Sequence, residues 1–201
     1  MLGSSIVAIA DGSILFTAFL TMVVSIILGM GLPTTACYII TATIAAPALL
    51  TMGVNALAAH MFCYYFACLS NLTPPVAIAS YGAAGISGQN PSKVGWKGFS
   101  IALPGFIIPF TFIFSPALLF VSEDLASVIV ASVTALIGVI AASAAMQGYI
   151  FKPMNLFFRV ALFGGACLLI FPGLATDAAG IAICGGIYLM QRMRMNTPAA
   201  A

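Results

Sequence analysis

Charged side chains are almost missing from this sequence, which carries six lysines and arginines and four aspartates and glutamates in 201 residues, 5% in all. Soluble domains have about 25% charged residues. The mean hydropathy is +1.19 and 63% of the residues are hydrophobic. The composition therefore excludes a soluble globular domain, and membrane lipid is the expected surrounding. A net charge of +2 gives no basic surface for nucleic acid.

Groups that perform acid–base or metal chemistry are equally scarce. The four acidic residues lie in predicted loops, so the chain can assemble neither paired carboxylates, nor a Ser/His/Asp set, nor a metal cluster. We predict that the protein is not an enzyme and holds no cofactor. The one histidine, His60, lies in an apolar segment; packing near the membrane interface is the favoured interpretation, and a proton-transfer role is the alternative. The cysteines form no CxxC pair and are interpreted as small buried hydrophobic residues: Cys37, Cys63, Cys68, Cys167 and Cys184.

Long apolar runs are what the sequence has in abundance. Residues 101–121 and 125–146 both reach the length of about 20 residues that crosses the hydrocarbon core. Because a helix satisfies its own backbone hydrogen bonds in lipid, we predict an all-α polytopic membrane protein. It divides into a first region, residues 1–121, and a set of C-terminal membrane helices with a short tail, residues 122–201.

The few charges alternate in sign along the chain. Their order is Asp11; Lys93 and Lys97; Glu123 and Asp124; Lys152 and Arg159; Asp177; Arg192 and Arg194. Basic loops stay in the cytoplasm. Segments 98–121 and 157–172 are therefore predicted to run outward, and segments 125–147 and 178–191 inward. The C-terminal tail is then cytoplasmic, and the loop at Glu123 is external.

The first ninety residues need an odd number of crossings to agree with these charges. They contain two apolar stretches, 14–50 and 54–88, and each is interrupted in its middle. The simplest arrangement makes 14–50 a re-entrant hairpin that enters and leaves on the external side, and 54–88 one broken helix. Residues 85–98 then form an interfacial loop, in which Trp96 suits the headgroup region.

The first interruption is the stretch GMGLPTTACY, which begins at Gly29. Gly29 and Gly31 permit turns and close approach. Pro33 removes a backbone donor, while Thr34 and Thr35 can bond the open amides at a helix start. In hydrocarbon, irregular backbone survives only where it is buried in protein or lines a wet cavity.

The second interruption, SNLTPPVA, is of the same kind. Pro74 and Pro75 stop the incoming helix, and Ser70, Asn71 and Thr73 supply side-chain oxygens beside the stop. The carbonyl end of a half-helix attracts cations and its amide end attracts anions. A single proline in a membrane helix is usually only a kink, but two consecutive breaks with hydroxyl groups favour an ion or substrate site.

The stretches LGMGLPTTACYIITATIAAPAL and FACLSNLTPPVAIASYGAAGISG resemble the large membrane subunit of TRAP (tripartite ATP-independent periplasmic) transporters. The resemblance covers roughly residues 1–120 and is closest to the fused variety, in which the small and large membrane subunits share one polypeptide. The remainder looks like the extra C-terminal helices of that variety. The resemblance implies the second inverted repeat of an elevator-type transporter, with the N-terminal repeat and the small membrane subunit preceding residue 1 or forming a separate chain.

The resemblance also implies a function. The chain would be the C-terminal part of a sodium-coupled permease of the bacterial inner membrane, which imports organic acids delivered by a periplasmic substrate-binding protein. Sodium, the coupling ion, would lie between the two breaks, held by backbone carbonyls and the Thr73 hydroxyl. The carboxylate would lie against half-helix amides. The alternative is a non-transporting membrane scaffold or a remnant of a truncated transporter gene, and the residues do not identify the carboxylate.

Overall fold

The computed structural model describes residues 2–121, 124–171 and 173–196. Within these ranges every regular element is a helix, apart from one isolated β-bridge. The all-α prediction is therefore confirmed. The predictions for the loop at Glu123 and for the tail beyond residue 196 fall outside the described residues.

Five helices form the N-terminal group: α1 (Leu2–Ile9), α2 (Ile14–Gly29), α3 (Thr34–Ile44), α4 (Ala46–Thr51) and α5 (Ala56–Leu69). Phe62 and Phe66 of α5 are fully buried, with ring centroids 4.8 Å apart. Phe110, from the later helix α8 (Ile108–Phe114), meets their rings edge-on at 5.4 and 6.1 Å. Helix α5 is therefore the centre of this group, and burial of these aromatic rings stabilises it.

The middle of the chain is a series of short helices. After α5 come η1 (Ser70–Leu72), α6 (Ile78–Ser87), α7 (Pro91–Ala102), η2 (Leu103–Phe106), α8 and η3 (Pro116–Leu119), where η marks a 3-10 helix. The helix predicted over 98–121 thus begins earlier, at Pro91, and is divided into four pieces. Prolines at the first turns of η2, α8 and η3 account for the divisions, since proline cannot donate to the preceding turn.

The prediction that residues 85–98 form a loop is wrong. Only three residues separate α6 from α7. The side-chain oxygen of Asn90 accepts hydrogen bonds from the amides of Ser92 and Lys93, at 2.9 and 3.4 Å, and Pro91 follows at the first helical position. This Asn-Pro pair is a helix start, because the amide that proline lacks would have no partner there in any case. The polar composition of this stretch suggested a loop, but the cap formed by Asn90 begins a helix there.

Three helices form the C-terminal group: α9 (Leu125–Gln147), α10 (Leu156–Ile170) and α11 (Leu174–Asn196). Asp124 caps α9 by accepting from the Ser127 hydroxyl at 2.6 Å and the Ala126 amide at 3.1 Å, and these bonds lower the pKa of its carboxyl group. At the other end, the Arg159 guanidinium donates to the carbonyls of Ala145 and Met146 at 3.0 and 2.8 Å. Both helix ends therefore have partners that suit the helix dipole.

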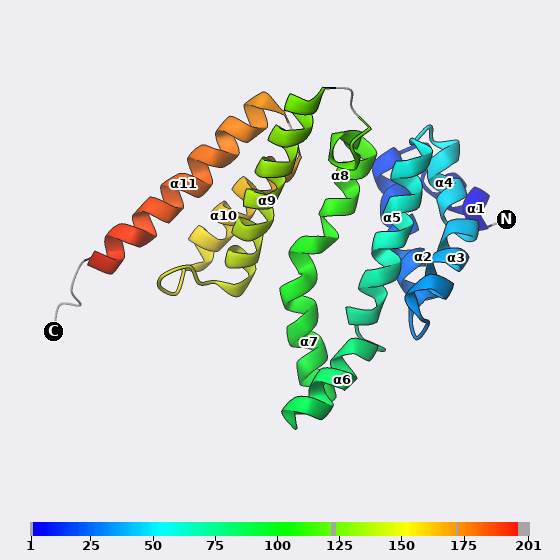
Figure 1. Cartoon of the computed structure of the whole chain (residues 1–201), viewed down its shortest axis with the longest axis horizontal. Coiled ribbons are helices and arrows are strands. Elements are labelled where there is room, and N and C mark those ends of the chain that lie inside the picture. Colours follow the sequence, from blue (N-terminus) through cyan, green and yellow to red (C-terminus); the bar gives the residue numbers. More distant parts are fainter. Residues whose placement is uncertain (1, 122–123, 172, 197–201) are drawn as a thin grey trace.

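Figure 1 shows how the groups are arranged, with the N-terminal group on one side, α9 to α11 on the other, and α7 and α8 between them. Three segments are long and apolar enough to cross a membrane: Thr34–Thr51, Pro91–Phe114 and Leu125–Gln147. Three shorter apolar helices accompany them: Ile14–Gly29, Ala56–Leu72 and Leu156–Ile170. The arrangement agrees with a polytopic membrane protein, while a re-entrant path for residues 14–50 stays a prediction.

Glycines let α9, α10 and α11 approach one another closely. A Cβ atom added to Gly138 of α9 would lie 3.0 Å from the carbonyl oxygen of Ala166 in α10. A Cβ added to Gly180 of α11 would lie 2.9 Å from the carbonyl oxygen of Gly165, also in α10. Because backbone atoms cannot move aside as a flexible side chain can, this packing requires glycine, as is common between membrane helices.

We expect Gly180→Ala to destabilise the C-terminal group, since the new methyl group meets the α10 backbone. Overpacking of this kind costs about 1–3 kcal/mol, which is a fall of several degrees in Tm. Gly185→Ala is the matched control, because a Cβ at Gly185 on the same helix meets nothing within 4 Å. The measurement is thermal denaturation of both purified variants in the same detergent. Equal Tm values would contradict the close contact.

Candidate functional site

The turn between α2 and α3 has an irregular backbone. Helix α2 ends at Gly29, and Met30 is extended, with φ −62° and ψ 122°. Gly31 adopts φ +84°, a conformation that favours glycine. Pro33 precedes the first residue of α3 and leaves the helix without a side-chain cap. The tip is therefore a tight turn whose first helical amides have no partner within α3.

The turn is held against the end of α5 by close contacts. A Cβ added to Gly29 would overlap the Cys37 sulfur and lie 2.5 Å from the Ser70 hydroxyl oxygen. Cys37 Sγ and Ser70 Oγ both donate to the carbonyl oxygen of Ala67, at 3.5 and 2.7 Å. Gly29, Cys37 and Ser70 are all buried. Glycine at position 29 is thus required for contact between the two irregular segments.

The second irregular segment follows α5. Ser70–Leu72 form the 3-10 turn η1, and Thr73 is extended, with φ −90° and ψ 122°. A cis peptide bond joins Pro74 to Pro75, and Ala77 is left-handed, with φ 35°. Helix α6 then begins at Ile78 without a side-chain cap. The backbone thus changes direction between the two helices and leaves the first amides of α6 open.

The two irregular segments border an open cavity of about 400 Å³, which we call the helix-end cavity. Its lining comes from the α2–α3 turn, from η1 and from the start of α6: Gly31, Leu32, Pro33, Thr34, Asn71, Ile78 and Ala79. Two helices, α3 and α6, begin at this cavity, while α2 and the α5–η1 segment end beside it. Open amides are therefore available at the starts of α3 and α6, while the carbonyl oxygens of Gly29, Leu69 and Ser70 already accept one hydrogen bond each.

This arrangement can bind charged groups without charged side chains. The amide ends of α3 and α6 provide donors and positive dipole ends for a carboxylate. The carbonyl oxygens at the ends of α2 and η1 each keep a second lone pair, and hard cations prefer oxygen ligands. Asn71 has no hydrogen bond to its side chain among the described residues, and its amide group can serve as either donor or acceptor. The Thr34 side chain lines the same space.

The structure separates the other predicted site residues from this cavity. Gly29 is buried in helix contacts, and Thr35 is exposed on α3. Pro74 and Pro75 line a neighbouring cavity of about 320 Å³ beside Trp96 of α7. Thus Gly31, Pro33, Thr34 and Asn71 come together, whereas the remaining candidates surround them.

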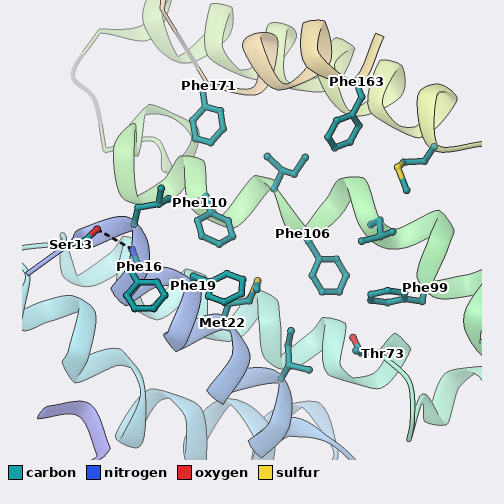
Figure 2. Close-up of a pocket in the computed structure, with 15 residues that line it drawn as sticks. Ser13, Phe16, Phe19, Met22, Thr73, Phe99, Phe106, Phe110, Phe163 and Phe171 are labelled. Carbon is teal, nitrogen blue, oxygen red and sulfur yellow. Dashed lines mark hydrogen bonds between the residues drawn. The ribbon is translucent and has the colours of Figure 1, made fainter. Parts of the chain in front are cut away.

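Thr73 faces a different space. Its hydroxyl donates to the carbonyl oxygen of Leu69 at 2.8 Å, and its side chain lines a groove of about 850 Å³ between α2 and the α7–α8 segment, which we call the aromatic groove (Figure 2). The hydroxyl oxygen keeps lone pairs that a cation can use. Whether Thr73 is a sodium ligand stays a prediction.

Two features of the site were not predicted from the sequence. Ile78 and Ala79 line the helix-end cavity through their position at the start of α6, and apolar residues give no chemical signal of that role. Cys37 and Ser70 hold the two breaks together; the sequence indicated Ser70 only as a source of oxygen and Gly29 only as a point of close approach. His60 Nδ1 lies 3.2 Å from the Tyr38 hydroxyl oxygen, and both interpretations of its role stay predictions.

The class of protein is now defined: a helical membrane protein whose interrupted helices border a cavity lined by helix ends. The family profile described as "Tripartite ATP-independent periplasmic transporter, DctM component" matches residues 1–123, more than half of the chain. The chain therefore belongs to the DctM family, the large membrane component of TRAP transporters, and the resemblance is confirmed. No curated protein and no solved structure matches it.

Membership settles the general function but not the details. The family is a transporter component rather than an enzyme family, and it works in the inner membrane with a periplasmic binding protein and a small membrane subunit. The two irregular segments and the helix-end cavity lie within the matched residues. Helices α9 to α11 lie beyond them.

We expect Gly29→Ala to separate the α2–α3 turn from the end of α5, because the methyl group overlaps Cys37 and Ser70. An overpacking cost of about 1–3 kcal/mol would raise the open fraction roughly five- to hundredfold. The measurement is the rate at which a maleimide labels Cys37 in a variant that lacks the other four cysteines. Gly82→Ala on α6 is the control, since that position is open. Equal labelling rates in both variants would refute the contact.

Proposed function

We propose that this chain is part of a sodium-coupled permease that takes up organic acids through the helix-end cavity. The observation that carries the proposal is the meeting of two amide ends, from α3 and α6, at one cavity of about 400 Å³. An organic acid is the ligand class that fits, because its carboxylate needs concentrated donors and a positive potential. The cavity supplies both in a region with almost no charged side chains.

The carboxylate is proposed to lie against the first amides of α3 and α6, with the Asn71 amide as a further donor. A cavity of this volume fits a small ligand, at the lower end of the range of about 300–1,000 Å³ for small-molecule sites. The aliphatic walls from Leu32 and Ile78 would contact the carbon skeleton. This chain offers no charged side chain to the ligand here, so specificity beyond the carboxylate would depend on shape and on partner subunits.

Sodium is proposed to lie at the carbonyl ends of α2 and of the α5–η1 segment, where backbone oxygens keep a lone pair beyond the hydrogen bond that they already accept. Bound sodium would offset the negative ends of these helices and raise the potential felt by the carboxylate. Binding of the ion and of the acid would therefore be mutually favourable, which is the thermodynamic requirement for coupled uptake. No resident cofactor is part of this proposal.

The basic ends of the helices are proposed to lie on the cytoplasmic side of the membrane. Lys97 Nζ donates to Gln147 Oε1 at 3.1 Å, so the middle of α7 lies beside the end of α9. Asp124 and Asp177 line one cavity at the opposite end of α9. The charges thus separate by sign in space, as the positive-inside rule requires for a cytoplasmic basic end and a cytoplasmic C-terminus.

Single cysteines test this orientation. In a variant without the native cysteines, Lys152→Cys should resist an impermeant thiol reagent in intact cells, whereas Ser127→Cys, near the opposite end of α9, should react. Both positions are exposed, so each should react once the membrane is permeabilised. Labelling of position 152 in intact cells would show that the protein has the opposite orientation.

Asn71→Leu tests the substrate site. The variant keeps a similar volume and removes the one uncharged amide side chain that lines the cavity. A hydrogen bond to a charged group is worth about 1.5–3 kcal/mol, so the half-saturating substrate concentration should rise roughly ten- to hundredfold. The measurement is uptake by the complete permease in proteoliposomes with its binding protein, normalised to folded protein. An unchanged value would remove Asn71 from the site.

Thr73→Val is the companion variant, since it removes a hydroxyl outside the cavity and keeps the side-chain shape. If the hydroxyl is a sodium ligand, the half-saturating sodium concentration should rise while substrate affinity at saturating sodium stays unchanged. An unchanged sodium response would leave the backbone carbonyls as the only ligands from this chain. Absence of any sodium-dependent uptake by the unmodified complete permease would favour the alternative, a non-transporting scaffold.

A further inference from the structure

The aromatic groove is twice the size of the helix-end cavity and has different chemistry. Its volume is about 850 Å³, and the lining is almost entirely apolar. Seven phenylalanines contribute to it: Phe16, Phe19, Phe99, Phe106, Phe110, Phe163 and Phe171. Figure 2 shows that Ser13 and Phe16 lie toward one end, Phe99 and Thr73 toward the other, and Phe106 and Phe110 between. The groove is therefore elongated and connects elements far apart in sequence.

The groove offers little to a polar solute. Of its lining residues only Ser13 and Thr73 carry hydroxyl groups, one at each end. Ser13 accepts from the Phe16 amide at 3.4 Å, and Thr73 donates to Leu69. Apolar cavities of this kind do not hold water stably. In a membrane protein, the chemistry that fits an elongated aromatic-lined groove is a hydrocarbon chain.

The two ends of the groove differ in charge. At the Phe99 end, Met146 lines the groove, and its carbonyl accepts from Arg159 at 2.8 Å. The next residue, Gln147, accepts from the exposed ammonium group of Lys97 at 3.1 Å. At the Ser13 end, the nearby charge along the chain is acidic, Asp11. Basic side chains therefore lie beyond one end of the groove, and an acidic residue lies two positions from the other.

The cations at this end have no anionic partner within the described part of the chain. Lys97 contacts a neutral amide, and Arg159 contacts carbonyl oxygens. The acidic residues of α9 and α11, Asp124 and Asp177, lie at the opposite end of those helices. A phosphate group placed at Lys97 would therefore meet uncompensated positive charge, and the Arg159 charge would add to the local potential.

We infer that the aromatic groove binds one anionic phospholipid, with an acyl chain along the phenylalanines and the phosphate at Lys97. Charge complementarity at one end and an apolar wall along the rest match the two parts of such a lipid. A spanning protein helix is about 10 Å across and 30 Å long, roughly 2,400 Å³. Such a helix would cover the groove from outside but would not enter it.

The position of the lipid gives it a function in the fold. The groove separates α2, which carries the α2–α3 turn, from α10 and the α7–α8 segment. A bound acyl chain would fill the space between them and hold the transport region against the C-terminal group. The inference does not depend on sodium or on the organic acid, so it can fail or succeed independently of the proposed function.

Tryptophan fluorescence tests the inference directly. Trp96 is the single tryptophan, so Trp96→Phe gives a dark background. Phe19→Trp then reports on the groove; Phe19 is 47% exposed and has space for the larger ring. Leu136→Trp, on α9 and 63% exposed, reports on bulk lipid. The full chain is reconstituted in phosphatidylcholine with rising fractions of phosphatidylglycerol whose acyl chains are brominated, which quenches nearby tryptophan.

We expect quenching at position 19 to reach half of its maximum at about a fivefold lower phosphatidylglycerol fraction than at position 136, since one basic residue near the surface contributes about that factor. Brominated phosphatidylcholine should quench both positions with the same dependence on its fraction. Lys97→Gln should abolish the preference of position 19 for phosphatidylglycerol. Lys93→Gln, one turn earlier on α7 and without a hydrogen bond to α9, should not.

Three results would overturn the inference. They are equal phosphatidylglycerol dependence at both reporters, a preference that survives Lys97→Gln, and an absence of quenching at position 19, which would mean that protein closes the groove. Size-exclusion profiles and circular dichroism establish that each variant is folded. Phe16→Trp replaces Phe19→Trp if the latter fails to fold, because Phe16 lines the same groove and is 44% exposed.

Discussion

The constraint on which this structure depends is that backbone amides and carbonyls need partners in a membrane. Two segments violate helical pairing, residues 30–33 and residues 73–77, and they lie against each other. Each segment alone would expose unpaired groups to lipid at a cost of several kcal/mol. Together they border a small open cavity, where the open amides can be satisfied by ligands. The site is thus a consequence of where helices end rather than of which side chains are charged.

Packing of small residues makes that arrangement possible. Gly29 brings the α2–α3 turn onto Cys37 and Ser70, and both of these side chains bond to the Ala67 carbonyl. Similar glycine contacts join α9, α10 and α11. Lipid gives helices little hydrophobic reason to associate, so close backbone approach and dispersion provide the attraction. The same principle therefore holds the site together and assembles the C-terminal group.

The two spaces in the molecule have complementary chemistry. The helix-end cavity has dipole ends and an amide but little apolar depth, which suits a small carboxylate with its coupling ion. The aromatic groove has apolar depth and a basic end, which suits a phospholipid. They lie on opposite sides of the end of α5, with Asn71 toward one and Thr73 toward the other. A lipid that positions α2 would also position the turn that α2 carries, so the two spaces are mechanically connected.

Composition and pattern by themselves determined the membrane class, the all-helical fold, the family and the position of both backbone breaks, because hydrocarbon solvation and proline chemistry act locally. Helix α9 was predicted at its observed bounds, since a capping aspartate and a long apolar run define it. Capping by Asn90 was overlooked, so α7 was mistaken for a loop. Only the tertiary structure decided which site residues share a cavity. Which side of a helix end a residue faces depends on turns such as those at Gly31 and Ala77, where the backbone is left-handed.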